Sequence, residues 1–259
     1  MPLERFAKPG EVEARTPQPE RLPRLSDMLQ EIWCRRLPQL VRVCEFLLGR
    51  AAKDTCRQRL VSPLQLMSFD LLTIGHSNLP AERFMALLTS AGVTAIADVR
   101  SVPFSRWCPW FSSKPLATGL AAEGLAYLPL GDELGGRPRD PQLYCDGIAD
   151  YEAMARRPEF CAGLDRVIDE TRRHRVCLLC SEREPLDCHR CLLVGRALAE
   201  RGVTLGHIRA DGTIEPHAVT EQRLIKLAGG QADLFGDPAV RLADAYRQRA
   251  RRVAARRKA

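Results

Sequence analysis

The chain has 259 residues, a formal net charge of +7 and a hydrophobic share of 45%. These values are typical of a globular protein with one medium-sized domain and extensions, or with two small domains. No apolar run is long enough to cross a bilayer and the N-terminus lacks the apolar core of a secretory signal, so we expect a cytoplasmic protein with no membrane partner.

Ten cysteines in a reducing compartment favour free thiols, metal ligands or catalysis over a disulfide framework. The positive charge is concentrated at the C-terminal end. Residues 241–259 hold eight Lys or Arg and one Asp, so the rest of the chain is balanced. Such a segment either binds nucleic acid or is simply a solvated basic helix end.

The N-terminal part of the chain differs from the rest. Residues 1–24 are charged and rich in proline, which predicts disorder. Two amphipathic helical segments follow, broken at Pro38. Met67 stands just before the first clear strand, so residues 1–66 are predicted to be a disordered and helical extension, either an appended module or sequence upstream of the true start.

From residue 70 onward, strand-length apolar runs alternate with helical patterns. Strands are predicted at 70–75, 93–99, 125–130, 175–180 and 203–208. Helices are predicted at 80–92, 114–124, 150–174 (in two pieces at Pro158) and 188–202. This alternation predicts a single α/β domain over 67–217, with a mostly parallel sheet flanked by helices. Residues 218–259 are expected to form a flexible basic tail.

Polar residues follow several of these strands where each strand ends. His76 follows the first strand, Asp98 and Arg100 end the second, Cys180 and Glu182 end the fourth, and His207 lies at the end of the last. Ligands of open parallel sheets bind beyond the carboxyl ends of the strands. The sequence therefore predicts a site at this edge.

The motifs "TIGHS", "DVRSVPFSR", "LGDELGGRPRD", "LLCSEREPLDCHRCLLV" and "HIRADG" occur in this order. Together they resemble the domain-of-unknown-function 488 family over about residues 70–217. The resemblance implies a compact α/β domain and shared site positions, but no reaction. It implies a pattern centred on the segment that runs from Cys180 to Arg190, with Glu182, Pro185, Cys188 and His189 inside it.

Four cysteines lie between Cys177 and Cys191, which raises the possibility of a four-cysteine zinc site. Side chains three apart on a strand point to opposite faces, so Cys177 and Cys180 are poorly placed to share an ion. Cys191 precedes an apolar run where a thiol packs well. The sequence therefore favours Cys177 and Cys191 as core residues.

The inner residues leave three chemical possibilities open. Cys188 opens a helix beside Arg190, where the pKa of a thiol is lowered, so Cys188 or Cys180 could be a nucleophile. The two thiols could form a redox pair, or they could bind zinc or iron with His189. In the structural alternative, Cys188 only caps the helix and Arg190 pairs with a carboxylate.

The other candidates divide by chemistry. His76 and Glu182 are predicted to transfer protons or polarise a substrate, and Asp98 to orient an arginine. A phosphate or carboxylate group suits guanidinium and hydroxyl donors. These predicted substrate-binding residues are Arg100, Ser101, Ser105, Arg137 and Arg190. Tyr127 and Arg139 are further candidates for the wall of the predicted site. Three aromatic residues could stack a base or pack on the core, and they are Trp107, Trp110 and Phe111.

A short motif lies in the C-terminal segment. Gln231, Leu234 and Phe235 belong to "QADLF", which resembles the pentapeptide that docks bacterial proteins on the DNA sliding clamp.

Taken together, the candidate residues predict an enzyme, a hydrolase or transferase acting on a nucleotide or nucleic acid. The alternatives are a metal-binding or thiol-redox protein, and a non-catalytic adaptor on the sliding clamp.

Overall fold

The computed structural model describes residues 68–229 and 237–257. The described residues all belong to one compact unit, Met67–Ala259. The predicted extension over 1–66 and the predicted clamp contacts of Gln231, Leu234 and Phe235 lie outside the described residues.

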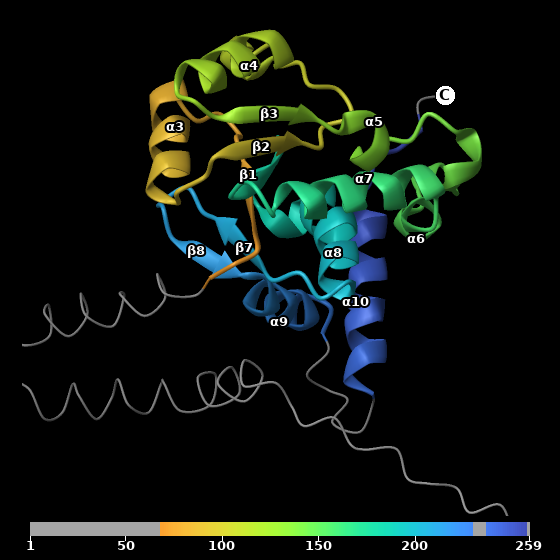
Figure 1. The fold of residues 1–259 in the computed structure, drawn as a ribbon. Helices are drawn as coiled ribbons and strands as arrows, with labels where there is room; N and C mark the ends of the chain where they lie inside the picture. The colour runs from red at the N-terminus through yellow and green to blue at the C-terminus, as the bar shows by residue number, and fades with distance from the viewer. Residues whose placement is uncertain (1–67, 230–236, 258–259) are drawn as a thin grey trace, which may run out of the picture. The chain divides into compact units, whose positions relative to one another are not determined.

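A six-stranded sheet forms the centre of the described domain, in the order β3-β2-β6-β1-β7-β8 (Figure 1). All neighbouring strands pair in parallel except β7 and β8. The strands are β1 (Leu71–Gly75), β2 (Ala95–Asp98), β3 (Ala126–Pro129), β6 (Val176–Cys180), β7 (Leu205–Ile208) and β8 (Ile214–Pro216). This arrangement confirms the predicted α/β class with a mostly parallel sheet.

Helices cover both faces of the sheet, because the central strands carry apolar side chains on both sides. On one face, α3 (Ala81–Ser90) and α4 (Ser113–Ala122) contribute the core. On the other, the core includes α6 (Tyr151–Ala155), α7 (Pro158–Glu170), a π-helix (Arg190–Gly195) and α8 (Arg196–Glu200). The break at Pro158 is as predicted. None of the described helices is long and apolar enough to cross a membrane.

Short elements connect these layers. They are a 3₁₀ turn at Pro109–Phe111, α5 (Gly131–Leu134), a 3₁₀ turn at Pro141–Leu143, the hairpin of β4 (Tyr144–Cys145) and β5 (Ile148–Ala149), and a 3₁₀ turn at Pro185–Asp187. Most of this connecting structure carries no strong apolar periodicity. The sequence therefore predicted no helix or strand between 130 and 150, and missed both α5 and the hairpin.

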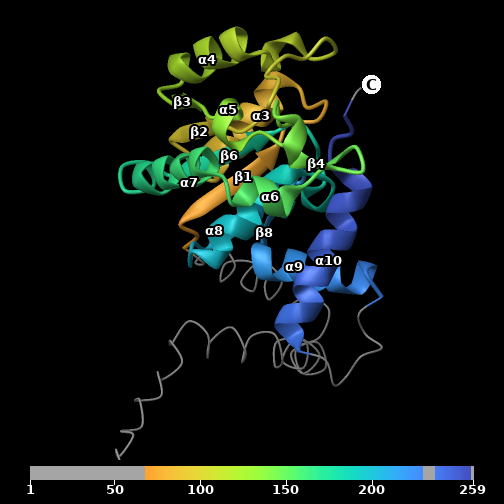
Figure 2. The same ribbon diagram turned by 90° about the vertical axis from the view of Figure 1, so that its right-hand side faces the viewer.

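The prediction of a flexible tail is wrong for the described part of 218–259. It forms α9 (His217–Leu227) and α10 (Pro238–Val253), which pack against each other (Figure 2). Tyr246 of α10 is buried, at 2% exposure, despite the many arginines around it. After α10 the chain is fixed to the β4–β5 hairpin, because Ala149 N–H donates to Ala255 O at 2.9 Å. The many arginines of α10 made its sequence look like a solvated tail, although a narrow apolar stripe that includes Ala245 and Tyr246 is buried.

A buried chain of hydrogen bonds joins α9 and α10 to the sheet. Thr73 Oγ1 lies 2.7 Å from His207 Nδ1, and His207 Nε2 lies 3.0 Å from His217 Nδ1. His217 Nε2 lies 3.0 Å from the Tyr246 hydroxyl, which lies 2.9 Å from Glu221 Oε1. With both histidines neutral, every group can donate to the next one toward Glu221, so the chain is fully satisfied.

We expect this chain to make the domain unstable in mild acid. Burial lowers the pKa of His217 to about 4, and burial with the neighbouring His217 also lowers the pKa of His207. The pKa of a histidine in the unfolded chain is about 6.5. Between that pH and 4, the unfolded state therefore binds more protons than the folded state. Unfolding free energy should therefore fall by about 2–3 kcal/mol for His217 alone between pH 7.5 and 4.5.

Urea unfolding at the two pH values measures this loss. The matched comparison is His217→Asn, which removes the titrating group and should reduce the difference between pH 7.5 and 4.5. If His217→Asn keeps the full pH dependence, the histidine chain is not its cause.

Candidate metal centre and active site

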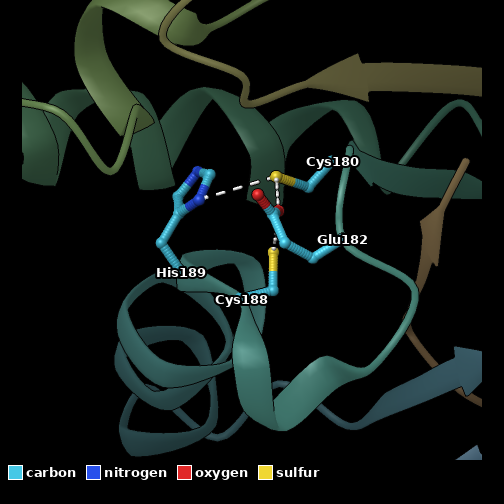
Figure 3. A group of neighbouring side chains, drawn as sticks. All are labelled: Cys180, Glu182, Cys188 and His189. Atoms are coloured by element: carbon cyan, nitrogen blue, oxygen red, sulfur yellow. Dashed lines mark hydrogen bonds between the residues drawn. The ribbon is translucent and has the colours of Figure 1, made fainter. Parts of the chain in front are cut away.

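Four side chains converge at the carboxyl end of β6 (Figure 3). Cys180 ends the strand, Glu182 lies on the next loop, and Cys188 and His189 precede the π-helix. The Sγ atoms of Cys180 and Cys188 lie 2.9 and 3.0 Å from the same oxygen, Glu182 Oε2. Cys180 Sγ lies 3.5 Å from His189 Nδ1. The potential ligand atoms of all four residues lie within 4.8 Å of one another.

The His189 ring is held in one orientation. Its Nε2 lies 2.8 Å from the carbonyl oxygen of Val99, just after β2, so Nε2 carries the proton and donates it. When the ring is neutral, Nδ1 is unprotonated and faces the thiols, and the neighbouring Cys188 raises the pKa of the ring despite its burial. A methyl group at Gly136 would lie 2.6 Å from His189 Cγ, so only glycine lets that loop pack on the ring. An imidazole fixed through its second nitrogen by a carbonyl is typical of metal ligands.

Arg190 positions the loop that carries Glu182. Its side chain is fully buried and donates to the carbonyl oxygens of Glu182 and Arg183, with a longer contact of 3.4 Å to Thr73 Oγ1. A methyl group at Gly75 would lie 1.7 Å from the Glu182 carbonyl oxygen, so β1 also approaches this loop closely. The prediction that Arg190 binds substrate is therefore corrected: its donors are used inside the protein.

The buried charges favour a thiolate at Cys188. Burial alone would raise the pKa of Cys188, but a hydrogen bond from Cys180 and the charges of Arg190 and His189 lower that pKa well below its usual value. Burial and the neighbouring Cys188 raise the pKa of Cys180. Burial raises the pKa of Glu182, and the neighbouring Cys188 raises it further. A thiolate is the form that binds metals or attacks substrates.

The predicted residues of β1 and β2 form a separate buried cluster. Arg100 donates to both carboxylate oxygens of Asp98, at 2.8 and 2.5 Å, and to Phe111 O at 2.7 Å. The Tyr127 hydroxyl donates to Asp98 at 2.8 Å. His76 is 4% exposed, stacks on Phe111 and accepts from Arg100 at 3.2 Å. Arg100 is thus paired with Asp98, and it also lines the cleft beside Cys180, Glu182 and His189, so its predicted role as an anion ligand stays a prediction.

His76 also differs from its predicted role in proton transfer. Its Nδ1 donates to Ser77 O at 2.9 Å, so both ring nitrogens have partners. Burial is the larger cause that lowers the pKa of His76 to about 4, and the charge of Arg100 is the second. A neutral, enclosed imidazole holds β1 to the Asp98–Arg100 pair and contacts none of the four converging side chains through a described hydrogen bond.

A cleft of about 300 Å³ opens beside Cys180, Glu182 and His189. Ser101 and Arg137 line it, and Arg137 N–H donates to Ser101 Oγ at 2.9 Å. The predicted Ser105 instead braces its own loop by accepting from a backbone N–H at 3.0 Å. Arg139 forms an exposed ion pair and lines a neighbouring pocket.

Several residues of the cleft were not predicted from the sequence. Tyr151 from α6 and Phe104 from the loop after β2 line it, as do Val253 and Ala255 near the end of α10. No spacing or motif connects these positions, because the fold brings them together from distant segments. The exposed fraction of Phe104, 69%, is the structural sign that distinguishes it.

The outer cysteines are core residues, as predicted. Cys177 and Cys180 belong to the cores on opposite faces of the sheet, and Cys191 is fully buried. Cys191 does lie within 4.8 Å of ligand atoms of His207 and His217. The nitrogens of both histidines are already used in the buried hydrogen-bond chain, so His207, predicted to reach the site, serves the core.

Comparison with protein-family models gives a match to part of the chain. Residues 80–197 match the family model described as "Domain of unknown function DUF488". The matched segment holds three of the five motifs, while "TIGHS" and "HIRADG" lie outside it. The match confirms the resemblance seen in the sequence. No curated protein and no solved structure matches the chain.

Proposed function

We propose that this chain, whose residues 80–197 match the DUF488 family model, is a metal-dependent hydrolase or transferase. One observation carries the proposal: two thiols, a carboxylate and an oriented imidazole converge within 4.8 Å. Thiolate with imidazole is a donor set that favours zinc, and iron is the alternative. Cys180, Cys188 and His189 would be the ligands, leaving a position for water or substrate.

The chain's own residues then have distinct tasks. A bound zinc ion would lower the pKa of a coordinated water and polarise an electrophile. Glu182, whose pKa is raised by burial and by Cys188, is suited to accept a proton near neutral pH. Arg190 holds the Glu182 loop, and Val99 holds the His189 ring. Arg137 and Ser101 line the cleft where an anionic substrate would bind.

A nucleotide or nucleic acid remains the substrate class that we propose. The support is the high arginine content of α10 and the position of Val253 and Ala255 in the cleft wall. Because these residues adjoin the arginine-rich end of the chain, a polyanion bound there would pass the candidate site.

Thiol chemistry is the second candidate. Cys180 and Cys188 contact the same carboxylate oxygen, so their sulfurs lie near each other, and the pKa of Cys188 is lowered. A disulfide between them would need the Glu182 carboxylate to move out. Thiol titration of metal-free protein, with and without mild oxidant, separates this candidate: a redox pair loses two reactive thiols together.

The test of the proposal is the metal content of tag-free protein by mass spectrometry. We expect about one zinc or iron per chain, and almost none in Cys180→Ala or Cys188→Ala, since each removes a thiolate ligand. Cys161→Ala is the matched control, because Cys161 is a free cysteine outside the site, and it should retain the metal. Equal metal in all three variants, or none in the unaltered protein, would refute the metal proposal.

A further inference from the structure

An exposed aromatic loop borders the candidate cleft. After β2, the loop leaves Phe104 69% exposed and Trp107 81% exposed, while Cys108 and Phe111 anchor it in the core. Its shape is set by its own hydrogen bonds, including Ser113 N–H to Pro103 O at 2.9 Å. Large apolar side chains held out of the core on an ordered loop are typical of binding sites.

The aromatic side chains are placed for stacking. Phe104 lines the same cleft as Cys180, Glu182 and His189. The guanidinium of Arg106 lies 5.0 Å from the centre of the Trp107 ring, so the loop offers an aromatic face together with a cation. Nucleic-acid bases stack on such faces when they are not paired in a duplex.

Exposed arginines stand next in the sequence to two residues of another wall of the cleft, and Arg251 and Arg252 line other pockets. Val253 and Ala255 contribute to this wall, and the chain there is fixed by Arg257 N–H to Gly147 O at 2.7 Å. The neighbouring exposed arginines form no ion pair with any other described residue. They are Arg251, Arg252, Arg256 and Arg257. Cations free of carboxylate partners are suited to phosphates.

From these observations we infer that the cleft binds single-stranded nucleic acid, with bases stacked on Phe104 and Trp107 and phosphates on the arginines at the end of α10 and just after it. This inference rests on the proposed function only for the reaction at Glu182. Binding of the strand does not depend on it. The exposed rings favour a single strand over a duplex, since the bases of a duplex are already stacked and paired.

Fluorescence anisotropy with a labelled 20-nucleotide single strand, and with the duplex of the same sequence, tests the inference on the full chain. The single strand should bind more tightly. Phe104→Ala/Trp107→Ala should weaken its binding about 30-fold or more, as expected for the loss of two stacked bases. If the protein contacts four phosphates, raising the salt concentration from 50 to 200 mM should weaken binding about 50-fold.

A charge-matched pair of variants isolates the arginines. Arg251→Gln/Arg252→Gln should weaken binding and reduce the salt dependence. Arg172→Gln/Arg173→Gln removes the same charge from the segment between α7 and β6, at the opposite edge of the sheet, and should change binding little. Equal weakening by both pairs, a preference for duplex, or full binding by Phe104→Ala/Trp107→Ala would overturn the inference.

This result is independent of the metal measurement. A protein that holds metal but binds no single strand would refute this inference alone. A protein that binds the strand through Phe104 and Arg251 but holds no metal would refute the metal proposal alone.

Discussion

Glu182→Gln is expected to lower turnover about 100- to 10,000-fold, the range for loss of a general base. The amide keeps the size of the carboxylate but cannot accept the proton, and the three proposed ligands remain. Metal content should therefore stay near that of the unaltered protein. The measurement is turnover of the best substrate found in a panel of nucleotides and short oligonucleotides, beside metal analysis of the same samples.

The matched control is Glu123→Gln, an exposed glutamate at the end of α4 that makes no ion pair with another described residue. It should leave turnover unchanged. If Glu182→Gln instead loses its metal, Glu182 is a ligand and the site is closed and structural. Full turnover with bound metal would remove Glu182 from the mechanism.

Asp98→Asn is expected to lower the free energy of unfolding by about 3–5 kcal/mol, because it leaves the buried Arg100 charge without its partner. Arg100 and Asp98 are only 3% and 1% exposed, and their closest contact is 2.5 Å. Urea unfolding followed by circular dichroism measures the change. Asp98→Asn/Arg100→Met removes the unpaired charge as well, so this double variant should be more stable than Asp98→Asn alone.

An exposed pair provides the comparison. Asp165 and Arg201 form an ion pair at 2.7 Å, but Asp165 is 69% exposed. Asp165→Asn should therefore cost no more than about 1 kcal/mol. If Asp98→Asn costs as little as Asp165→Asn, the buried pair does not hold β2 and its loop as we describe.

The sequence was sufficient to predict the sheet and the inner cysteine cluster. Alternation along "RVCLLC" placed Cys177 and Cys180 on opposite faces, and the strand ends placed Cys180 and Glu182 at one edge. These predictions succeeded because they depend on local periodicity and on residues within about one turn of each other.

The failures involve contacts between distant residues. Thr73 and His207 are 134 positions apart, and Tyr246 and His217 are 29 apart. No local pattern indicates that these polar groups satisfy one another in the core, so His207 was assigned to the site and α10 to a flexible tail. The direction of a long side chain is equally hidden. Arg190 follows two site residues, yet its guanidinium points to the carbonyls behind them.

X-ray absorption at the metal edge is the most direct test of the central claim, because it identifies the ligand atoms themselves. On the purified, tag-free protein we predict two sulfur ligands at about 2.3 Å, with nitrogen or oxygen ligands at about 2.0–2.1 Å. Cys188→Ala should remove sulfur scattering together with most of the metal. A bound metal surrounded only by nitrogen and oxygen, or a protein without stoichiometric metal, would contradict a metal centre at Cys180, Cys188 and His189.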